Sequence, residues 1–117
     1  MKFDTSMNEA GVNSIQIVRI LKALADHKRL AMAQAIAEAG EMPCGELVKR
    51  FPIAQATVSH HMKVLVDSGI VSVRREGQYA YFSINGDIAE QARSAFSDFF
   101  RREKPGQRRS AARSVQP

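Results

Sequence analysis

Residues 55–83, QATVSHHMKVLVDSGIVSVRREGQYAYFS, decide the fold of this 117-residue chain. The first half of the stretch repeats largely apolar residues at the spacing i, i+3, i+4 and i+7, namely Val58, His61, Met62 and Leu65. This spacing places the four residues on one side of an α-helix, and we expect that side to pack inward. Gly69 can adopt the positive φ that closes a helix, so the helix is predicted to end there.

The opposite side of this helix carries short polar residues that suit contacts with DNA. Its members are Ala56, Ser59, His60 and Lys63, with Gln55 and Thr57 in the first turn. A helix that enters the major groove needs small or hydrogen-bonding side chains near its N-terminal end, where the backbone comes closest to the bases. The solvated side of an ordinary amphipathic helix has a similar composition, so the helix alone leaves both interpretations open.

Two β-rich runs follow the helix and predict a hairpin with arginines beside its tip. Residues 70–75 and 78–84 flank the Glu-Gly link 76–77, which has glycine at a position that primed turns favour. Arg74 and Arg75 would lie beside this link, where guanidinium groups can reach phosphates or a narrow minor groove. Solubilising charges on an edge strand are the alternative. A helix followed at once by such a hairpin predicts a winged helix-turn-helix that binds duplex DNA.

The rest of the chain predicts a mainly α domain (α+β class) of about five helices with this β-hairpin as its wing. A first helix is expected from an Asn13 cap to about Ala25, and a second from an Asp26 cap to Gly40. A third, short helix is expected near residues 44–51. Before the recognition helix, Ala54 stands where a capping side chain would be expected, so this helix start lacks a cap.

A last helix is predicted after the wing, starting at the D-x-x-E pattern of Asp87 and Glu90. Its apolar face consists of Ile88, Ala92, Ala95, Phe96, Phe99 and Phe100. The first helix also carries more apolar surface than one stripe can hold, so we expect the two helices to pair across a two-fold axis in a homodimer. The expected interface residues are Ile17, Ile20, Leu24, Phe96, Phe99 and Phe100. Docking of the last helix on its own domain is the alternative.

Length and charge fit one small domain. We expect a flexible lead over residues 1–11, a DNA-binding and dimerisation domain over 12–103, and a basic disordered tail over 104–117. From residue 101 onward there are six basic residues and one acidic residue, which equals the whole net charge of +5. Residues 1–100 are therefore neutral overall, and DNA affinity must come from the placement of individual cations and not from bulk charge.

The sequence also indicates where the protein works. No apolar run approaches the roughly 20 residues that span a bilayer, and the N-terminus has no signal-peptide core, so we expect a cytoplasmic protein without membrane contact. The single cysteine excludes an intrachain disulfide, in keeping with a reducing compartment.

Four blocks, in this order and at tight spacing, resemble the ArsR/SmtB family of bacterial winged-helix repressors. They are LKALADHKRL (21–30), GELVKRF (45–51), ATVSHHMKVL (56–65) and SGIVSVRREGQYAYFSI (68–84). The resemblance covers roughly residues 15–100. It implies a homodimeric regulator of transcription, a repressor that binds double-stranded DNA at an inverted-repeat operator. Two recognition helices would then lie one duplex turn apart, about 34 Å.

The best-known members of that family bind metals at two places, and this sequence lacks both ligand sets. Pro43 and Gly45 stand at the positions of a Cys-x-Cys pair in the third helix, and residues 87–104 contain neither His nor Cys. We therefore expect no metal site and no cofactor, and the effector stays open. Cys44 suggests a thiol-based redox or electrophile-responsive repressor as one alternative, although a small buried apolar role is the simpler interpretation.

Other function classes are less well supported by the sequence. No nucleophile–base constellation, phosphate-binding glycine loop or metal cluster occurs, so we expect no enzymatic activity. A winged-helix module that binds proteins and never DNA is the remaining alternative.

Overall fold

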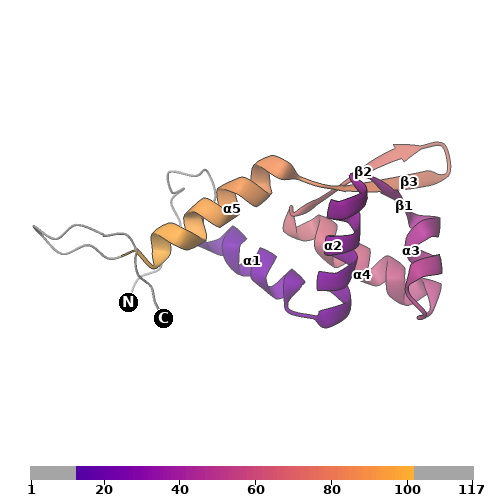
Figure 1. Ribbon diagram of the computed structural model, residues 1–117, viewed down its shortest axis with the longest axis horizontal. Helices are drawn as coiled ribbons and strands as arrows, with labels where there is room; N and C mark the ends of the chain where they lie inside the picture. Colours follow the sequence, from indigo (N-terminus) through magenta and orange to yellow (C-terminus); the bar gives the residue numbers. More distant parts are fainter. Residues whose placement is uncertain (1–12, 102–117) are drawn as a thin grey trace, which may run out of the picture.

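The computed structural model describes residues 13–101, which form five helices and a three-stranded sheet. In chain order the elements are α1 (Ser14–Leu24), α2 (His27–Ala39), β1 (Met42–Pro43), α3 (Cys44–Arg50), α4 (Gln55–Ser68), β2 (Val71–Glu76), β3 (Tyr79–Ile84) and α5 (Gly86–Phe99). Figure 1 shows α2, α3 and α4 gathered in one part of the molecule, with the β2–β3 hairpin projecting beyond them. The mainly α, winged helix-turn-helix fold predicted from the sequence is confirmed. The predicted lead (1–11) and tail (104–117) lie outside the described residues.

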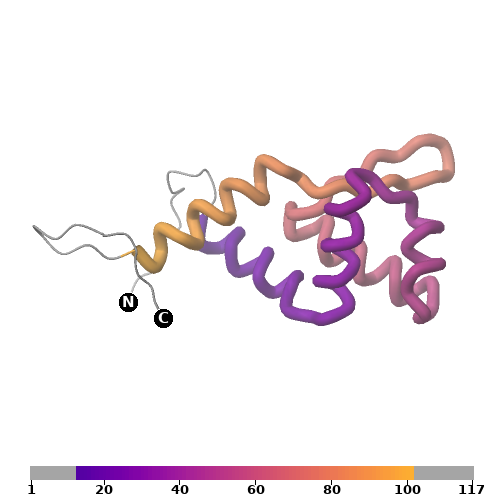
Figure 2. The backbone as a smooth tube through the Cα atoms, viewed as in Figure 1, coloured from indigo at the N-terminus to yellow at the C-terminus, as the bar shows by residue number. Residues whose placement is uncertain are grey.

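The chain returns from the hairpin to its first helix. In the backbone tube of Figure 2, an extended link leads from β3 into α5, and α5 then runs alongside α1. Ile17 of α1 and Ala95 of α5 are buried together in a small second apolar cluster. The first and last helices are therefore neighbours within one protomer.

Two of the predicted helix starts are confirmed by their capping hydrogen bonds. The side-chain oxygen of Asn13 accepts a hydrogen bond of 2.9 Å from the backbone N–H of Gln16 at the start of α1. The carboxylate of Asp26 accepts hydrogen bonds from the backbone N–H groups of Lys28 and Arg29 at the start of α2. These bonds satisfy backbone donors that a helix start leaves without a partner.

Two local predictions are wrong by one or two residues. The helix α5 begins at an Asn85 cap, whose side chain accepts a hydrogen bond from Ile88 N–H, and not at Asp87. The link of the hairpin is 77–78 and not 76–77, because Glu76 still pairs with Tyr79. Gly77 has a φ of 61°, so glycine takes the first position of the turn, where the left-handed backbone is needed.

The sheet contains one strand that the sequence analysis does not predict. The two residues of β1 pair antiparallel with β3, Met42 opposite Phe82 and Pro43 opposite Tyr81. The strand order is β1-β3-β2, so β3 lies in the middle of the sheet and β2 forms its outer strand. A two-residue strand is too short to leave an alternating pattern in the sequence.

The main core lies between the helices and the inner face of the sheet. Its fully buried large side chains are Met32, Ile36, Met42, Leu47, Val58 and Leu65. Burying an apolar side chain of this size contributes roughly 1.5–3 kcal/mol. The predicted inward side of α4 is confirmed, since Val58, His61, Met62 and Leu65 are all buried. The core thus fixes how α4 is rotated about its own axis.

The start of α4 offers a direct test of helix capping. Ala54 has the extended backbone of a cap residue (φ −61°, ψ 145°) but no side chain that can accept a hydrogen bond. We expect Ala54→Ser to raise the free energy of unfolding by about 1 kcal/mol, measured by urea denaturation. The control Ala56→Ser adds the same hydroxyl inside the first turn and should bring no such gain. A serine at position 54 that leaves stability unchanged would contradict this account of the helix start.

Candidate DNA-binding surface and dimer face

The polar side of α4 is exposed along its whole length. The six α4 residues predicted to contact DNA are all exposed: Gln55, Ala56, Thr57, Ser59, His60 and Lys63. They alternate with the buried residues of the same helix, so the helix separates an inner apolar side from an outer polar side. The outer side offers hydroxyl, amide, imidazole and ammonium groups that can bind base edges and phosphates.

The ammonium group of Lys63 has a weak partner on its own helix. Its Nζ atom lies 3.0 Å from Oδ2 of Asp67, and both side chains are largely exposed. Exposed ion pairs of this kind contribute little to stability because water screens them. Lys63 can therefore exchange Asp67 for a phosphate oxygen at small cost.

The two arginines of the wing point to opposite faces of the hairpin. Arg75 pairs with Ala80 across the strands, and both residues line an open cavity of about 380 Å³ between α4 and the wing. Ser59 and Lys63 of α4 line the same cavity. Arg75 therefore lies on the same side of the wing as the outer residues of α4.

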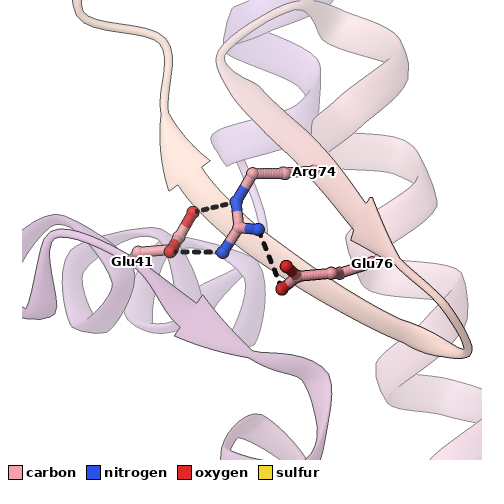
Figure 3. A network of polar contacts seen from close by, with 3 residues as sticks. All are labelled: Glu41, Arg74 and Glu76. Atoms are coloured by element: carbon pink, nitrogen blue, oxygen red, sulfur yellow. Dashed lines mark hydrogen bonds and ion pairs between the residues drawn. The ribbon is translucent and has the colours of Figure 1, made fainter.

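Arg74 lies on the other face of the hairpin and is held by acidic residues. Figure 3 shows its guanidinium group between Glu41 and Glu76. Nε and Nη2 donate to the two carboxylate oxygens of Glu41 at 3.1 and 3.0 Å, and Nη1 donates to Glu76 at 3.1 Å. The guanidinium carbon also lies 4.5 Å from the centre of the Tyr81 ring. The hydrogen bond from Arg74 lowers the pKa of Glu41, and the bonds to Glu41 and Glu76 raise the pKa of Arg74.

His61 of the recognition helix contacts α2 directly and is linked through Arg29 to the end of α1. Nη1 of Arg29 lies 3.2 Å from Nδ1 of His61, while Nε of the same arginine donates to the carbonyl of Ala23 at the end of α1. An arginine can only donate, so Nδ1 of His61 accepts and the imidazole is neutral. Burial lowers the pKa of His61; Arg29, His60 and Lys28 act in the same direction, and the carboxylate of Asp26 opposes them.

Cys44 is a half-buried residue at the start of α3 and also lines the cavity beside α4. Within residues 13–101, no three side chains of the His, Cys, Asp and Glu types converge in a way that would hold a metal ion. The structure thus gives Cys44 no such ligand partners in the described part of the chain, and its predicted redox role stays a prediction.

The apolar residues of α1 divide between the interior and the surface. Ile17 and Ile20, both expected in the dimer interface, are 5% and 4% exposed and pack within the protomer, and Leu24 is half-buried against the main core. A different set of α1 residues is exposed together with the aromatic residues at the end of α5: Ile15, Val18, Leu21, Phe96, Phe99 and Phe100. These six residues are called the α1–α5 face below. Monomeric proteins seldom leave so large an apolar group uncovered.

In the described part of the chain, no helix combines the length and the apolar character that crossing a membrane requires.

Comparisons with known proteins agree with this geometry. A family model described as a helix-turn-helix domain matches residues 19–74. The chain is 35% identical over 75 residues to the arsenical resistance operon repressor of Staphylococcus aureus, which covers 64% of this chain and 71% of the repressor. It is 29% identical over 79 residues to the cadmium resistance transcriptional regulatory protein CadC homolog of the same species, covering 68% of this chain and 65% of that protein.

A solved structure has the same fold. The homodimeric winged helix-turn-helix DNA-binding domain of a possible ArsR-family transcriptional regulator from Mycobacterium bovis matches with a TM-score of 0.60 and 25% identity. The match covers 80% of this chain and 87% of that domain.

The buried imidazole predicts a specific dependence of stability on pH. The folded protein lowers the pKa of His61, so the unfolded chain takes up the proton first as the pH falls through about 6.5. His61 should therefore cost no stability above that pH and an increasing amount below it. When the pH is lowered from 7.5 to 5.5, the free energy of unfolding should decrease less in His61→Gln than in wild type, as measured by urea denaturation at each pH. The control His60→Gln, at an exposed position, should behave as wild type does, and equal losses in all three proteins would refute this reading of His61.

Proposed function

The chain belongs to the ArsR family of winged helix-turn-helix transcriptional regulators, and we propose that it is a cytoplasmic repressor that binds an inverted-repeat operator as a homodimer. The observation that carries the proposal is the contrast between the two sides of α4. Its inner side is fixed in the core, and its outer side presents six exposed polar or small residues. A helix held in this way can enter a major groove without disturbing the fold.

The names of the similar proteins favour DNA binding over a module that binds only proteins. The staphylococcal relatives are named as a repressor and a transcriptional regulatory protein, and the mycobacterial domain is described as DNA-binding and homodimeric. For this chain the same role is supported by Ser59, Lys63 and Arg75, which surround one cavity between the recognition helix and the wing. A DNA backbone that passes between helix and wing would meet a hydroxyl and two cations there, of which Lys63 would have to leave its partner Asp67, which lines the same cavity.

The α1–α5 face supports the proposed dimer. Its six apolar residues come from two neighbouring helices, and the rings of Phe96 and Phe100 lie in contact at a tilted angle, with their centres 5.1 Å apart. A second copy of the chain would cover this face symmetrically, because a two-fold interface joins the same patch on both subunits. Because Ile17 and Ile20 are buried within the protomer and Leu24 is half-buried, we propose Ile15, Val18 and Leu21 as the α1 contacts of the dimer in their place.

We further propose that DNA is released by a signal other than a bound metal ion. Pro43 and Gly45 cannot ligate a metal through their side chains, and α5 carries neither His nor Cys. A hard-oxygen site built from Asp87 and Glu90 alone would hold a transition metal poorly. A thiol-dependent signal at Cys44 is the alternative that the cavity beside α4 leaves open.

Substitution of the α1–α5 face tests the dimer. Leu21→Glu places a charge on an apolar surface that the partner would bury, so we expect the protein to be monomeric at micromolar concentrations where wild type is dimeric, as measured by analytical ultracentrifugation. Its affinity for DNA should fall at least tenfold, because one monomer contacts only half of the operator. The control Leu30→Glu changes a similarly exposed leucine on α2 and should leave the dimer intact. A wild-type protein that is monomeric under these conditions would exclude the proposal.

Two substitutions in α4 separate phosphate contacts from base contacts. The DNA target is a duplex selected from a random pool by the wild-type protein. Lys63→Ala should weaken binding to this target and to unrelated duplexes alike, and it should reduce the slope of log K against log salt by about 1. Ser59→Ala should leave the salt slope unchanged and alter the sequence preference. The assignment of Lys63 would be wrong if its variant kept the wild-type salt slope, and binding without any sequence preference would favour the protein-interaction alternative.

A further inference from the structure

The contacts of Arg74 form a connection across the whole sheet. We call Arg74, Glu41, Glu76 and Tyr81 the Arg74 brace. Arg74 belongs to the outer strand β2, and its guanidinium group lies over Tyr81 of the middle strand β3. The guanidinium group donates hydrogen bonds to Glu41, the residue that immediately precedes β1 on the far side of the sheet. The side chain therefore links the wing to the segment that leaves α2.

This connection supplements a short strand pairing. Beyond the hairpin itself, the wing strands pair with one further strand, β1, which has only two residues, Met42 and Pro43. Proline has no backbone N–H to donate, so this ladder can contribute few hydrogen bonds. The paired, planar contact between the guanidinium group and the Glu41 carboxylate adds two hydrogen bonds of fixed direction.

The charge of the brace disfavours contact with DNA. One guanidinium cation is surrounded by the carboxylates of Glu41 and Glu76, so the three groups together carry one negative charge. A DNA phosphate would meet this net negative charge unless Arg74 first gave up its carboxylate partners. Arg75, on the opposite face, has no ion pair within the described residues and lines the same cavity as Lys63.

We propose that Arg74 is a positioning residue, which sets the orientation of the wing through Glu41, and that Arg75 is the arginine by which the wing contacts DNA. The proposal rests on the DNA-binding function proposed above. It assigns different roles to two neighbouring arginines that look equivalent in the sequence. It also means that Glu41, an acidic residue on the body of the domain, strengthens the binding of a polyanion.

The decisive experiment removes the charge of Glu41. If Arg74 contacted DNA directly, Glu41→Gln would free its cation and remove a negative charge, and binding to the selected duplex would become tighter. If Arg74 is a positioning residue, Glu41→Gln loosens the wing, and we expect binding to weaken by about threefold to tenfold with an unchanged salt slope. The control Glu38→Gln makes the same charge change on the exposed end of α2 and should not weaken binding. Tighter binding by the Glu41 variant would overturn the proposal.

Variants of the arginines complete the test. Arg74→Gln should weaken binding by at least the factor found for Glu41→Gln, because it also removes the contacts with Glu76 and Tyr81. The double variant should be no weaker than Arg74→Gln, because both substitutions break the same Arg74–Glu41 contact. Arg75→Ala should instead reduce the salt slope by about 1. Additive losses in the double variant, or a reduced salt slope for Arg74→Gln, would assign Arg74 to direct DNA contact and refute the positioning role.

Hydrogen exchange on the free protein separates failure of this inference from failure of the proposed function. The backbone amides of β2 and β3 should exchange faster in Glu41→Gln and in Arg74→Gln than in wild type, and at the wild-type rate in Glu38→Gln. Unchanged exchange in the wing would refute the brace whatever the protein binds. A different result is faster exchange in the two variants together with a wild-type protein that selects no duplex from the random pool. That result would keep the brace but reject both the repressor function and the role of Arg74 in positioning the wing for DNA.

Discussion

Burial of one side of α4 is the constraint on which the rest of the molecule depends. Val58, Met62 and Leu65 are almost completely buried among side chains from α2, α3 and the sheet. A well-packed core tolerates little rotation of such a helix, because rotation would open cavities on one side and cause clashes on the other. The outer polar side of α4 is therefore held in one direction, and the proposed DNA-binding surface is a consequence of how the core is packed.

The wing adds a second constraint through strand alternation. Neighbouring residues of a strand point to opposite faces, so Arg74 and Arg75 cannot share one ligand on the same face of the hairpin. The turn fixes which arginine faces which way, since Gly77 provides the positive φ at its first position. A shift of the pairing by one residue would exchange the two arginines and place the acidic partners of Arg74 away from it.

The sequence predicts the order of elements well and the long-range contacts poorly. Helix periodicity and caps such as Asn13 and Asp26 are local signals, and the structure confirms both caps. The contact between Glu41 and Arg74 joins residues 33 positions apart, and no local sequence pattern predicts such a contact. The first helix is apolar on two sides, so periodicity alone could not tell that Ile20 faces the core while Leu21 is exposed. The predicted DNA contacts of α4 are all exposed, but exposure does not test whether they bind DNA.

The same packing connects the proposed dimer interface to the recognition helix. One side of α1 contributes Ile20 and Ala23 to the main core, which also contains the inner side of α4, and the other side belongs to the α1–α5 face. Arg29 reinforces this junction, because it donates both to the carbonyl of Ala23 and to His61 on α4. In the proposed dimer, the spacing of the two recognition helices is therefore set through α1. The proposed inverted-repeat operator would require that spacing to match one duplex turn, so in the proposed dimer a displacement of α1 against α4 would weaken DNA binding.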